Sequence, residues 1–372
     1  MRSSFVRASD AIAVACLVCS LGLGAAGFAV AQSPAAPPPA VESQVVTPPQ
    51  DLARQQQKQQ VVQPGNNEPV WREIRSGIPQ TTTVRGRETN VLIMPEGETW
   101  RALRNGQVSV YGGWALVVVF LAILTFYWIK GPIGLHEPPT GRFVRRFSAW
   151  ERILHWTNAG AFSILAISGL IILFGKSVLL PLIGYTLFSW LAIVSKNLHN
   201  FVGPLFIVTL VLMFVTFVRS NLWRAYDLIW IRKFGGLVTH EHVPSHRFNA
   251  GEKAWFWGGI LVLGLVVGAS GLVLDFPNFN QTRETMQIAN IVHLIGATLF
   301  MIGSLGHIYM GTVGMKGAYA AMKTGYVDET WAKEHHEYWY NDIKAGRISV
   351  PVETHAPRAS DRVTGSVRAA GD

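Results

Sequence analysis

The stretch MQIANIVHLIGATLFMIGSLGHIYMGTVGM, residues 286–315, decides the fold class of this chain. It contains no Lys, Arg, Asp or Glu and is long enough to cross a bilayer as an α-helix. Its two histidines, His293 and His307, are fourteen residues apart. Since that spacing is nearly four helical turns, we expect both rings on one helix face, about 21 Å apart along the axis. Ionisable groups inside a membrane span are costly, so each histidine is a candidate functional residue.

The composition favours a multi-span membrane protein. Of the 372 residues, 49% are hydrophobic and only 15% are charged, which is too apolar for an ordinary soluble chain of this length. The net charge of +9 does not indicate nucleic-acid binding, because the basic residues lie between the apolar runs. Both cysteines, Cys16 and Cys19, lie in the first twenty residues. A mature chain that begins after them has no thiol for an iron–sulfur cluster, a disulfide or a thioether-bound haem.

The sequence divides into six segments. An N-terminal apolar run after Arg2 and Arg7 ends in small residues before Gln32, a pattern typical of a cleaved secretory signal. Pro-rich and Gln-rich sequence follows and cannot form a core. The predicted segments are a signal peptide (1–31), a disordered linker (32–69), a small exported segment with some β-structure (70–110), a first transmembrane helix (111–130), a four-helix domain (131–318) and a C-terminal tail (319–372).

The distribution of basic residues predicts the topology. Five spans are expected, at about 114–129, 153–174, 199–217, 254–274 and 287–313. Residues 130–152 contain five basic residues and residues 219–253 contain six, whereas the opposite loops contain only Lys176, Lys196 and Arg283. This bias places the two basic loops in the cytoplasm. With an exported N-terminal segment and five spans, the C-terminus is then cytoplasmic as well.

The topology pairs four histidines by depth. His155 begins an outward-running span and His307 ends an inward-running one, so both are expected near the cytoplasmic face. His199 and His293 begin inward-running spans and are expected near the periplasmic face. Two imidazoles at each of two depths suit two b-type haems, because such a haem needs two axial ligands and an apolar slot. The alternative for each histidine is a structural polar residue that bonds a neighbouring carbonyl.

Glycines accompany these histidines along the helices. Gly169, Gly203, Gly296 and Gly303 lie three, four or fourteen residues from a histidine and share roughly its helix face. Small residues there would let a porphyrin approach the backbone, although small residues are also common in ordinary membrane helix packing. Other histidines are weaker candidates. Among these, His240, His242 and His246 have metal-like spacing without a further ligand type, and His335 and His336 indicate a polar contact surface.

Several motifs resemble the gamma subunit, the cytochrome b subunit, of membrane-bound formate dehydrogenases. The resemblance covers about residues 145–344, and the exported stretch 85–106 is similar to a longer form of this subunit. The motifs are ERILHW at 151–156, LHN at 198–200, RFNAGEK at 247–253, VH at 292–293, GHIYM at 306–310 and WAKEHH at 331–336.

This resemblance implies an all-α membrane protein of the bacterial inner membrane, with four of its five helices forming a di-haem cytochrome b bundle. It implies that His155 and His307 bind the cytoplasmic-side haem iron, and that His199 and His293 bind the periplasmic-side haem iron. It also implies a quinone near Asn249 and Gly251. The implied partners are an iron–sulfur (beta) subunit and a molybdenum- or tungsten-containing catalytic (alpha) subunit, which would pass electrons inward to the quinone.

Three alternatives stay open at the level of sequence. Asn249 is also placed to cap a helix, with Glu252 at the third helical position of a capping box. The cytochrome b subunit of a nickel–iron hydrogenase or of another molybdoenzyme would have similar haem helices. A haem-free membrane anchor or transporter would use buried histidines for proton relay.

Overall fold

A computed structural model describes residues 72, 75, 96–236, 243–279 and 281–354 of the chain. The predicted signal peptide and linker, and most of the predicted exported segment, lie outside these residues. The chain divides into two units, Met1–Glu98 and Thr99–Asp372. The first unit contributes to the described structure mainly the start of helix α4, Glu96–Ala102.

Five helical segments in the described residues are long and apolar enough to cross a membrane. This confirms the prediction of an all-α membrane protein with five spans. The segments are Gly97–Lys130, Ala149–Val178, Leu180–Asn221, Ala250–Asp275 and Arg283–Gly314. Their elements are α4, η1 (Leu103–Val108) and α5 (Ser109–Lys130); α6 (Ala149–Val178); α7 (Leu180–Phe217) and η2 (Val218–Asn221); α9 (Ala250–Trp255), η4 (Phe256–Leu263) and α10 (Gly264–Asp275); and α11 (Arg283–Tyr309) with η5 (Met310–Gly314).

Side-chain caps fix where several of these helices begin. Ser148 and Glu151 form a capping box at the start of α6, and Asn249 and Glu252 form another at the start of α9. In each box the first side chain accepts from a backbone N–H that lacks a helical partner. The Thr282 side chain caps α11 in the same way through the Thr285 N–H. These caps place the helix starts in the polar loops rather than within the apolar runs.

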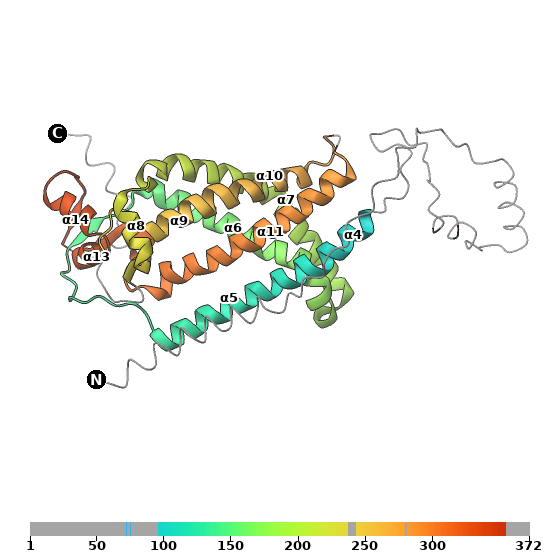
Figure 1. Cartoon of the computed structure of the whole chain (residues 1–372), viewed down its shortest axis with the longest axis horizontal. Helices are drawn as coiled ribbons and strands as arrows, with labels where there is room; N and C mark the ends of the chain where they lie inside the picture. Colours follow the sequence, from blue (N-terminus) through green and yellow to red (C-terminus); the bar gives the residue numbers. More distant parts are fainter. Residues whose placement is uncertain (1–71, 73–74, 76–95, 237–242, 280, 355–372) are drawn as a thin grey trace, which may run out of the picture. The chain divides into compact units, whose positions relative to one another are not determined.

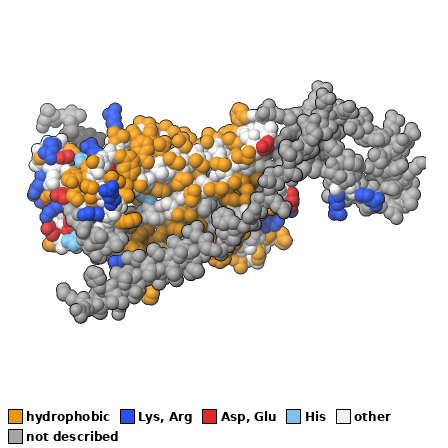
Figure 2. All heavy atoms as spheres, viewed as in Figure 1, with side chains coloured by type: hydrophobic (Ala, Val, Ile, Leu, Met, Phe, Trp, Pro, Cys, Tyr) orange, Lys and Arg blue, Asp and Glu red, His pale blue; other side chains and the backbone are white. Residues whose placement is uncertain are grey.

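The helices pack in sequential pairs. α6 packs along α7 and α10 along α11, while α10 also contacts α7 and α5 packs against α11 (Figure 1). In the middle of the bundle the rings of Phe162, Phe206 and Phe300 contact one another at centroid distances of 5.2–6.2 Å. Hydrophobic side chains also cover much of the outer surface between the two ends (Figure 2). An apolar outer surface of this kind is suited to lipid rather than water.

The loops expected in the cytoplasm fold together at one end of the bundle. Strand β1 (Phe143–Arg145) pairs antiparallel with β2 (Tyr326–Asp328) on one side and with β3 (Val352–Glu353) on the other. Lysine and arginine side chains gather over this end (Figure 2). The remaining elements there are α8 (Ala225–Arg232), η3 (Phe234–Gly236), α12 (Ala318–Thr324), α13 (Glu329–His335) and α14 (Glu337–Lys344).

The C-terminal tail, as far as residue 354, is a folded part of this end. Trp331 and Trp339 are each only 2% exposed and belong to the main hydrophobic core. His336 is 1% exposed, and its Nδ1 lies 2.6 Å from the His246 carbonyl oxygen. Burial is the main cause that lowers the pKa of His336 well below its ordinary value, with the Arg146 charge adding to it. A neutral His336 is therefore part of the packing between the tail and the loop before α9, where a polar contact surface was predicted.

Two helices begin earlier than the sequence predicted. The third span was expected from His199, but α7 begins at Leu180 and continues past Gly184, whose φ of 74° is non-helical. No proline or further glycine interrupts the chain between Tyr185 and His199, so the helix continues and His199 lies in its middle. The first transmembrane helix was expected from residue 111, yet helical structure is continuous from Glu96. The end of the segment predicted to contain β-structure is therefore helical.

Candidate functional site

His199 and His293 face each other across the bundle. His199 lies on α7 and His293 on α11, and their ring centres are 6.1 Å apart with an interplanar angle of 78°. A cavity of about 540 Å³ is lined by both rings and otherwise mainly by apolar side chains of α6, α7, α10 and α11. The depth argument paired these two residues, and the structure brings them together.

A serine and a glycine from a neighbouring helix hold each of these rings. Gly169 of α6 lies against His199, where an added Cβ would come within 3.2 Å of the ring Cε1. Gly271 of α10 lies against His293 in the same way, at 3.3 Å. The preceding residue in each case, Ser168 or Ser270, places its Oγ 2.9 or 3.2 Å from the ring Nδ1. The same Ser-Gly pair thus supports both histidines.

The hydrogen bonds around these serines favour one tautomer of each histidine. Ser168 Oγ donates its hydrogen to the Ile164 carbonyl, 2.7 Å away, so it accepts from Nδ1–H of His199. Ser270 Oγ likewise donates to its own helix, and the Val267 carbonyl oxygen is a second acceptor 3.1 Å from His293 Nδ1. With Nδ1 protonated, Nε2 of each ring keeps its lone pair for a metal.

Polar side chains line the same cavity. Arg104 and Lys196 are among its lining residues, and Arg104 Nε donates a 3.0 Å hydrogen bond to Asn290 Oδ1. One carboxylate, Asp275, also lines the cavity, so the charged groups in its lining are two cations and one anion. Gly203 also lines the cavity and has open space where a Cβ would lie.

His155 and His307 form a second facing pair. His155 lies on α6 and His307 on α11, with ring centres again 6.1 Å apart and an interplanar angle of 55°. Trp255 stacks on His307 at a centroid distance of 5.6 Å. His155 Nδ1 is buried and lacks a hydrogen-bond partner. The second depth-matched pair is therefore also brought together, and its surroundings differ from those of the first.

The spacing of both pairs fits bis-imidazole ligation of one metal ion. Imidazole nitrogen binds a first-row transition metal at about 2 Å, and the ring centre lies about 1 Å further, so two axial rings would be about 6 Å apart. Both observed separations are 6.1 Å. Within the described residues no group of three or more His, Cys, Asp or Glu side chains is arranged to hold a metal ion. Two opposed imidazoles in an apolar slot suit a b-type haem, because its porphyrin supplies the other four ligands.

The glycines flanking the histidines have several different roles. Gly169 was expected on the face of His155, but it supports His199 instead. A Cβ on Gly296 would meet the Val266 and Val267 side chains, so this glycine permits ordinary helix packing. A Cβ on Gly303 would overlap the Trp255 ring. Sequence analysis missed Ser168, Ser270, Gly271 and Trp255, although the repeated Ser-Gly-Leu at 168–170 and 270–272 was a signal for the first three.

Asn249 and Gly251 lie at the start of α9. Asn249 Oδ1 accepts from the Glu252 N–H, and Glu252 Oε2 accepts from the Asn249 N–H, both at 2.9 Å. The capping alternative is thus present in the structure. An added Cβ at Gly251 would come within 2.9 Å of the Trp230 ring. Since α9 ends at Trp255, which stacks on His307, this short helix connects both residues to the second histidine pair.

Ion pairs join the loops around α9. Arg146 Nη2 contacts Glu252 at 2.9 Å, and Arg247 Nη2 contacts Glu151 at 2.7 Å. Lys253 Nζ donates to Asp227 Oδ2 at 2.7 Å in a pair whose side chains are 2% and 1% exposed. No pattern in the sequence indicates this buried pair, because its two residues are 26 positions apart and lie in different helices. Three histidines were weak candidates for a metal site. His246 Nε2 lies 3.1 Å from Asp342 Oδ2, and His240 and His242 lie outside the described residues.

The chain is similar to several known proteins. The prokaryotic cytochrome b561 family matches residues 146–325. The formate dehydrogenase cytochrome b556(fdo) subunit of Escherichia coli K12 is 31% identical over 208 residues, which are 54% of this chain and 92% of that protein. The nitrate-inducible formate dehydrogenase cytochrome b556(Fdn) subunit of the same strain is 27% identical over 205 residues, which are 52% of this chain and 88% of that protein. The formate dehydrogenase cytochrome b556 subunit of Haemophilus influenzae is 25% identical over 203 residues, which are 51% of this chain and 79% of that protein.

Proposed function

Because this chain belongs to the family of formate dehydrogenase cytochrome b subunits, we propose that it passes electrons through two b haems to a quinone. The observation that supports this most strongly is the two histidine pairs with equal 6.1 Å ring separations. In the proposal His199 and His293 bind one haem iron, and His155 and His307 bind the other. A b-type haem supplies reversible one-electron transfer when it is bound.

The proposed direction of electron flow follows from the proposed topology. The end that contains the small sheet and the basic loops is assigned to the cytoplasm. Electrons then enter on the periplasmic side, near His199 and His293, and leave near His155 and His307. The proposed donor is an iron–sulfur subunit, which receives electrons from a separate molybdenum- or tungsten-containing subunit that oxidises formate. Quinone reduction at the cytoplasmic side would take up protons there and generate a proton motive force.

The purified complex provides the direct test. Formate should reduce a b-type α band, and an added quinone should reoxidise it. Reduction by hydrogen but not by formate would contradict the assigned donor and favour a hydrogenase subunit. A complex prepared with haem supplied, yet without a b-type band, would contradict the cytochrome assignment and favour an anchor or transporter.

The proposed quinone site includes Asn249 and Gly251. Its support is the position of α9, whose last residue, Trp255, stacks on His307. The Asn249 Oδ1 atom is already used in the cap, so the side-chain amide N–H is the group left to donate to a quinone carbonyl. The same side chain would then cap the helix and contact the substrate.

Asn249→Ser separates these two roles of Asn249. Serine is about as good an N-cap as asparagine but lacks the amide donor, so stability should change by only a few tenths of a kcal/mol. We expect quinone reduction to slow about five- to tenfold, since a hydrogen bond worth about 1–1.5 kcal/mol is lost. Asn249→Ala should show the same loss and about 1 kcal/mol of destabilisation as well. Steady-state quinone kinetics and thermal unfolding measure both effects, and full activity in Asn249→Ser would exclude the contact.

Ser168→Ala tests the support of His199. Removal of the group that orients a ligating imidazole typically costs about 10–100-fold in metal affinity, and we expect a loss of this size for the haem between His199 and His293. Ser163→Ala is the matched control, because Ser163 lies on the same helix and its hydroxyl bonds the Ala159 carbonyl without contacting a histidine. Haem retention during dilution, followed by absorbance, measures the difference. Equal retention in the two variants would show that Ser168 does not position His199.

A further inference from the structure

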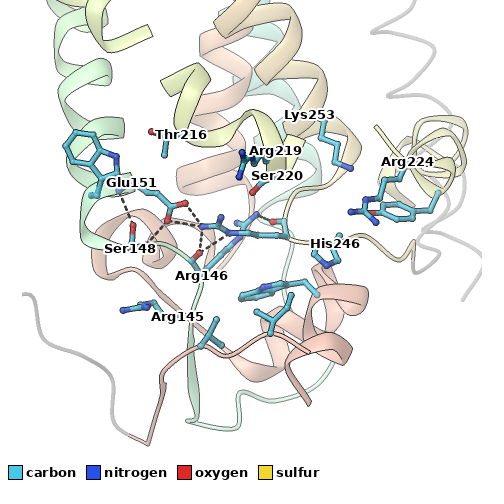
Figure 3. A pocket seen from close by; sticks show the side chains of 16 residues that line it. Arg145, Arg146, Ser148, Glu151, Thr216, Arg219, Ser220, Arg224, His246 and Lys253 are labelled. Carbon is cyan, nitrogen blue, oxygen red and sulfur yellow. Dashed lines mark hydrogen bonds and ion pairs between the residues drawn. The ribbon is translucent and has the colours of Figure 1, made fainter. Parts of the chain in front are cut away.

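A second cavity, of about 590 Å³, lies at the end of the bundle that contains the small sheet (Figure 3). Its walls come from β1 and the start of α6, the end of α7 with η2, the loop before α8, the loop before α9, and the C-terminal tail. It is separate from the cavity between His199 and His293, and none of the four paired histidines lines it.

The wall of this cavity is strongly cationic. Six lining residues are basic: Arg145, Arg146, Arg219, Arg224, Arg247 and Lys253. Glu151 is the one carboxylate among its lining residues. Since like charges repel, such a concentration of cations favours an anion between them.

Carboxylates balance only half of these cations. Arg146, Arg247 and Lys253 each have one ion-pair partner, Glu252, Glu151 and Asp227 respectively. The side chains of Arg145, Arg219 and Arg224 form no ion pair within the part of the chain that the structure describes. Three positive charges therefore remain around the cavity.

Arg146 provides a second, independent indication of a ligand. Its side chain is only 4% exposed, yet its Nε donor has no hydrogen-bond partner. A buried donor that stays unpaired costs about 1–3 kcal/mol, so such groups normally have a partner. An anion with several acceptor oxygens in this cavity would provide one.

The position of the cavity indicates the kind of anion. It is bounded by Thr216 near the end of a membrane span, and Trp150 in its wall is 54% exposed. Exposed tryptophan is typical of the level of the lipid headgroups. Guanidinium groups bind phosphate oxygens in a bidentate manner, and basic pockets at the cytoplasmic ends of spans attract anionic headgroups.

We propose that this cavity binds a phosphate group, supplied either by an anionic phospholipid or as free phosphate. Arg219 and Arg224, which come from the chain between α7 and α8, line the cavity with guanidinium groups that form no ion pair in the described residues. Arg146, whose side chain is buried, also lines the cavity. The bound group would connect the ends of α6 and α7 to the loop before α9 and to the tail.

The test compares Arg219→Gln/Arg224→Gln with Arg232→Gln/Lys316→Gln in the purified, delipidated complex. Both double variants remove two exposed charges from the same end, but only the first pair lines the cavity. The probes are phosphatidylglycerol and inorganic phosphate, with phosphatidylcholine and chloride at matched ionic strength as references. Binding is measured by native mass spectrometry and by the shift of the thermal midpoint, and the haem spectrum verifies folding.

We expect saturable binding of one probe to the wild type, weakened about tenfold or more in the cavity variant and by less than twofold in the control. Binding of phosphatidylglycerol alone identifies a lipid, and binding of inorganic phosphate identifies the free ion. Equal weakening in both variants would show general surface attraction and overturn the site. Absence of saturable binding of either probe to the wild type would overturn it as well.

Discussion

Replacing His293 with alanine is expected to remove one of the two proposed b haems, and with it about half of the reduced-minus-oxidised α-band absorbance. His199→Ala should remove the same haem, because the two rings face each other at 6.1 Å and one axial imidazole alone holds the group weakly. Electron transfer from formate to quinone should fall to background in both variants. The remaining haem should keep its spectrum and its redox midpoint.

The same experiment at the other pair gives the complementary result. His155→Ala or His307→Ala should remove the other haem and leave the first one spectrally intact. His246→Ala is a matched control, since this histidine lies in a loop and bonds Asp342 rather than a second histidine. Loss of the same centre in His199 and His307 variants would contradict the pairing. Retention of both haems in any of the four variants would exclude that residue as a ligand.

Lys253→Met should produce a large loss of stability. Lys253 and Asp227 are buried, with side chains 2% and 1% exposed, and Asp227 Oδ1 has no hydrogen-bond partner. Without the ammonium group the Asp227 carboxylate would be a buried, uncompensated charge. Breaking such a pair costs about 3–5 kcal/mol. Equilibrium unfolding in mixed micelles, followed by the haem absorbance, measures the change.

A double variant and an exposed pair provide the controls. Lys253→Met/Asp227→Leu removes both charges and should recover most of the stability, because well-packed apolar residues often replace a buried pair without loss. Lys333→Met breaks the exposed pair with Glu137, whose side chains are 51% and 58% exposed, and should leave stability nearly unchanged, because water and salt screen an exposed pair. A coupling energy below about 1 kcal/mol between Lys253 and Asp227 would show that burial of this pair has little effect on stability.

The number of spans was predictable because it depends on local sequence. A long apolar run is visible within one stretch of the sequence. The number of basic residues in each loop is visible in the same way, without any knowledge of how the helices pack. The predicted start of a span was less accurate where no proline or glycine interrupts the chain just before it. No residue after Gly184 stops α7, so this helix extends some nineteen residues before His199, where hydropathy alone had placed the start of the span.

The supporting residues were not predictable by the same reasoning. Helical spacing assigned Gly169 to His155 on its own helix, whereas the structure places it against His199 of the next helix. Ser270 and Gly271 likewise support a ring on α11 from α10. Spacing along one helix reports which residues share a face, but the rotation of neighbouring helices decides what that face meets.

By itself, the sequence determined an all-α membrane protein with five spans, and it grouped four histidines at two depths. These properties depend on hydropathy, charge and helical rise. Each of these is a sum over neighbouring residues and can be calculated without knowing how the helices pack. Only the tertiary structure decided that the rings face each other at 6.1 Å, that Ser168 and Ser270 orient two of them, and that the tail and loops form a cationic cavity. These features require side chains from different helices and loops to meet, and packing of the whole bundle determines that.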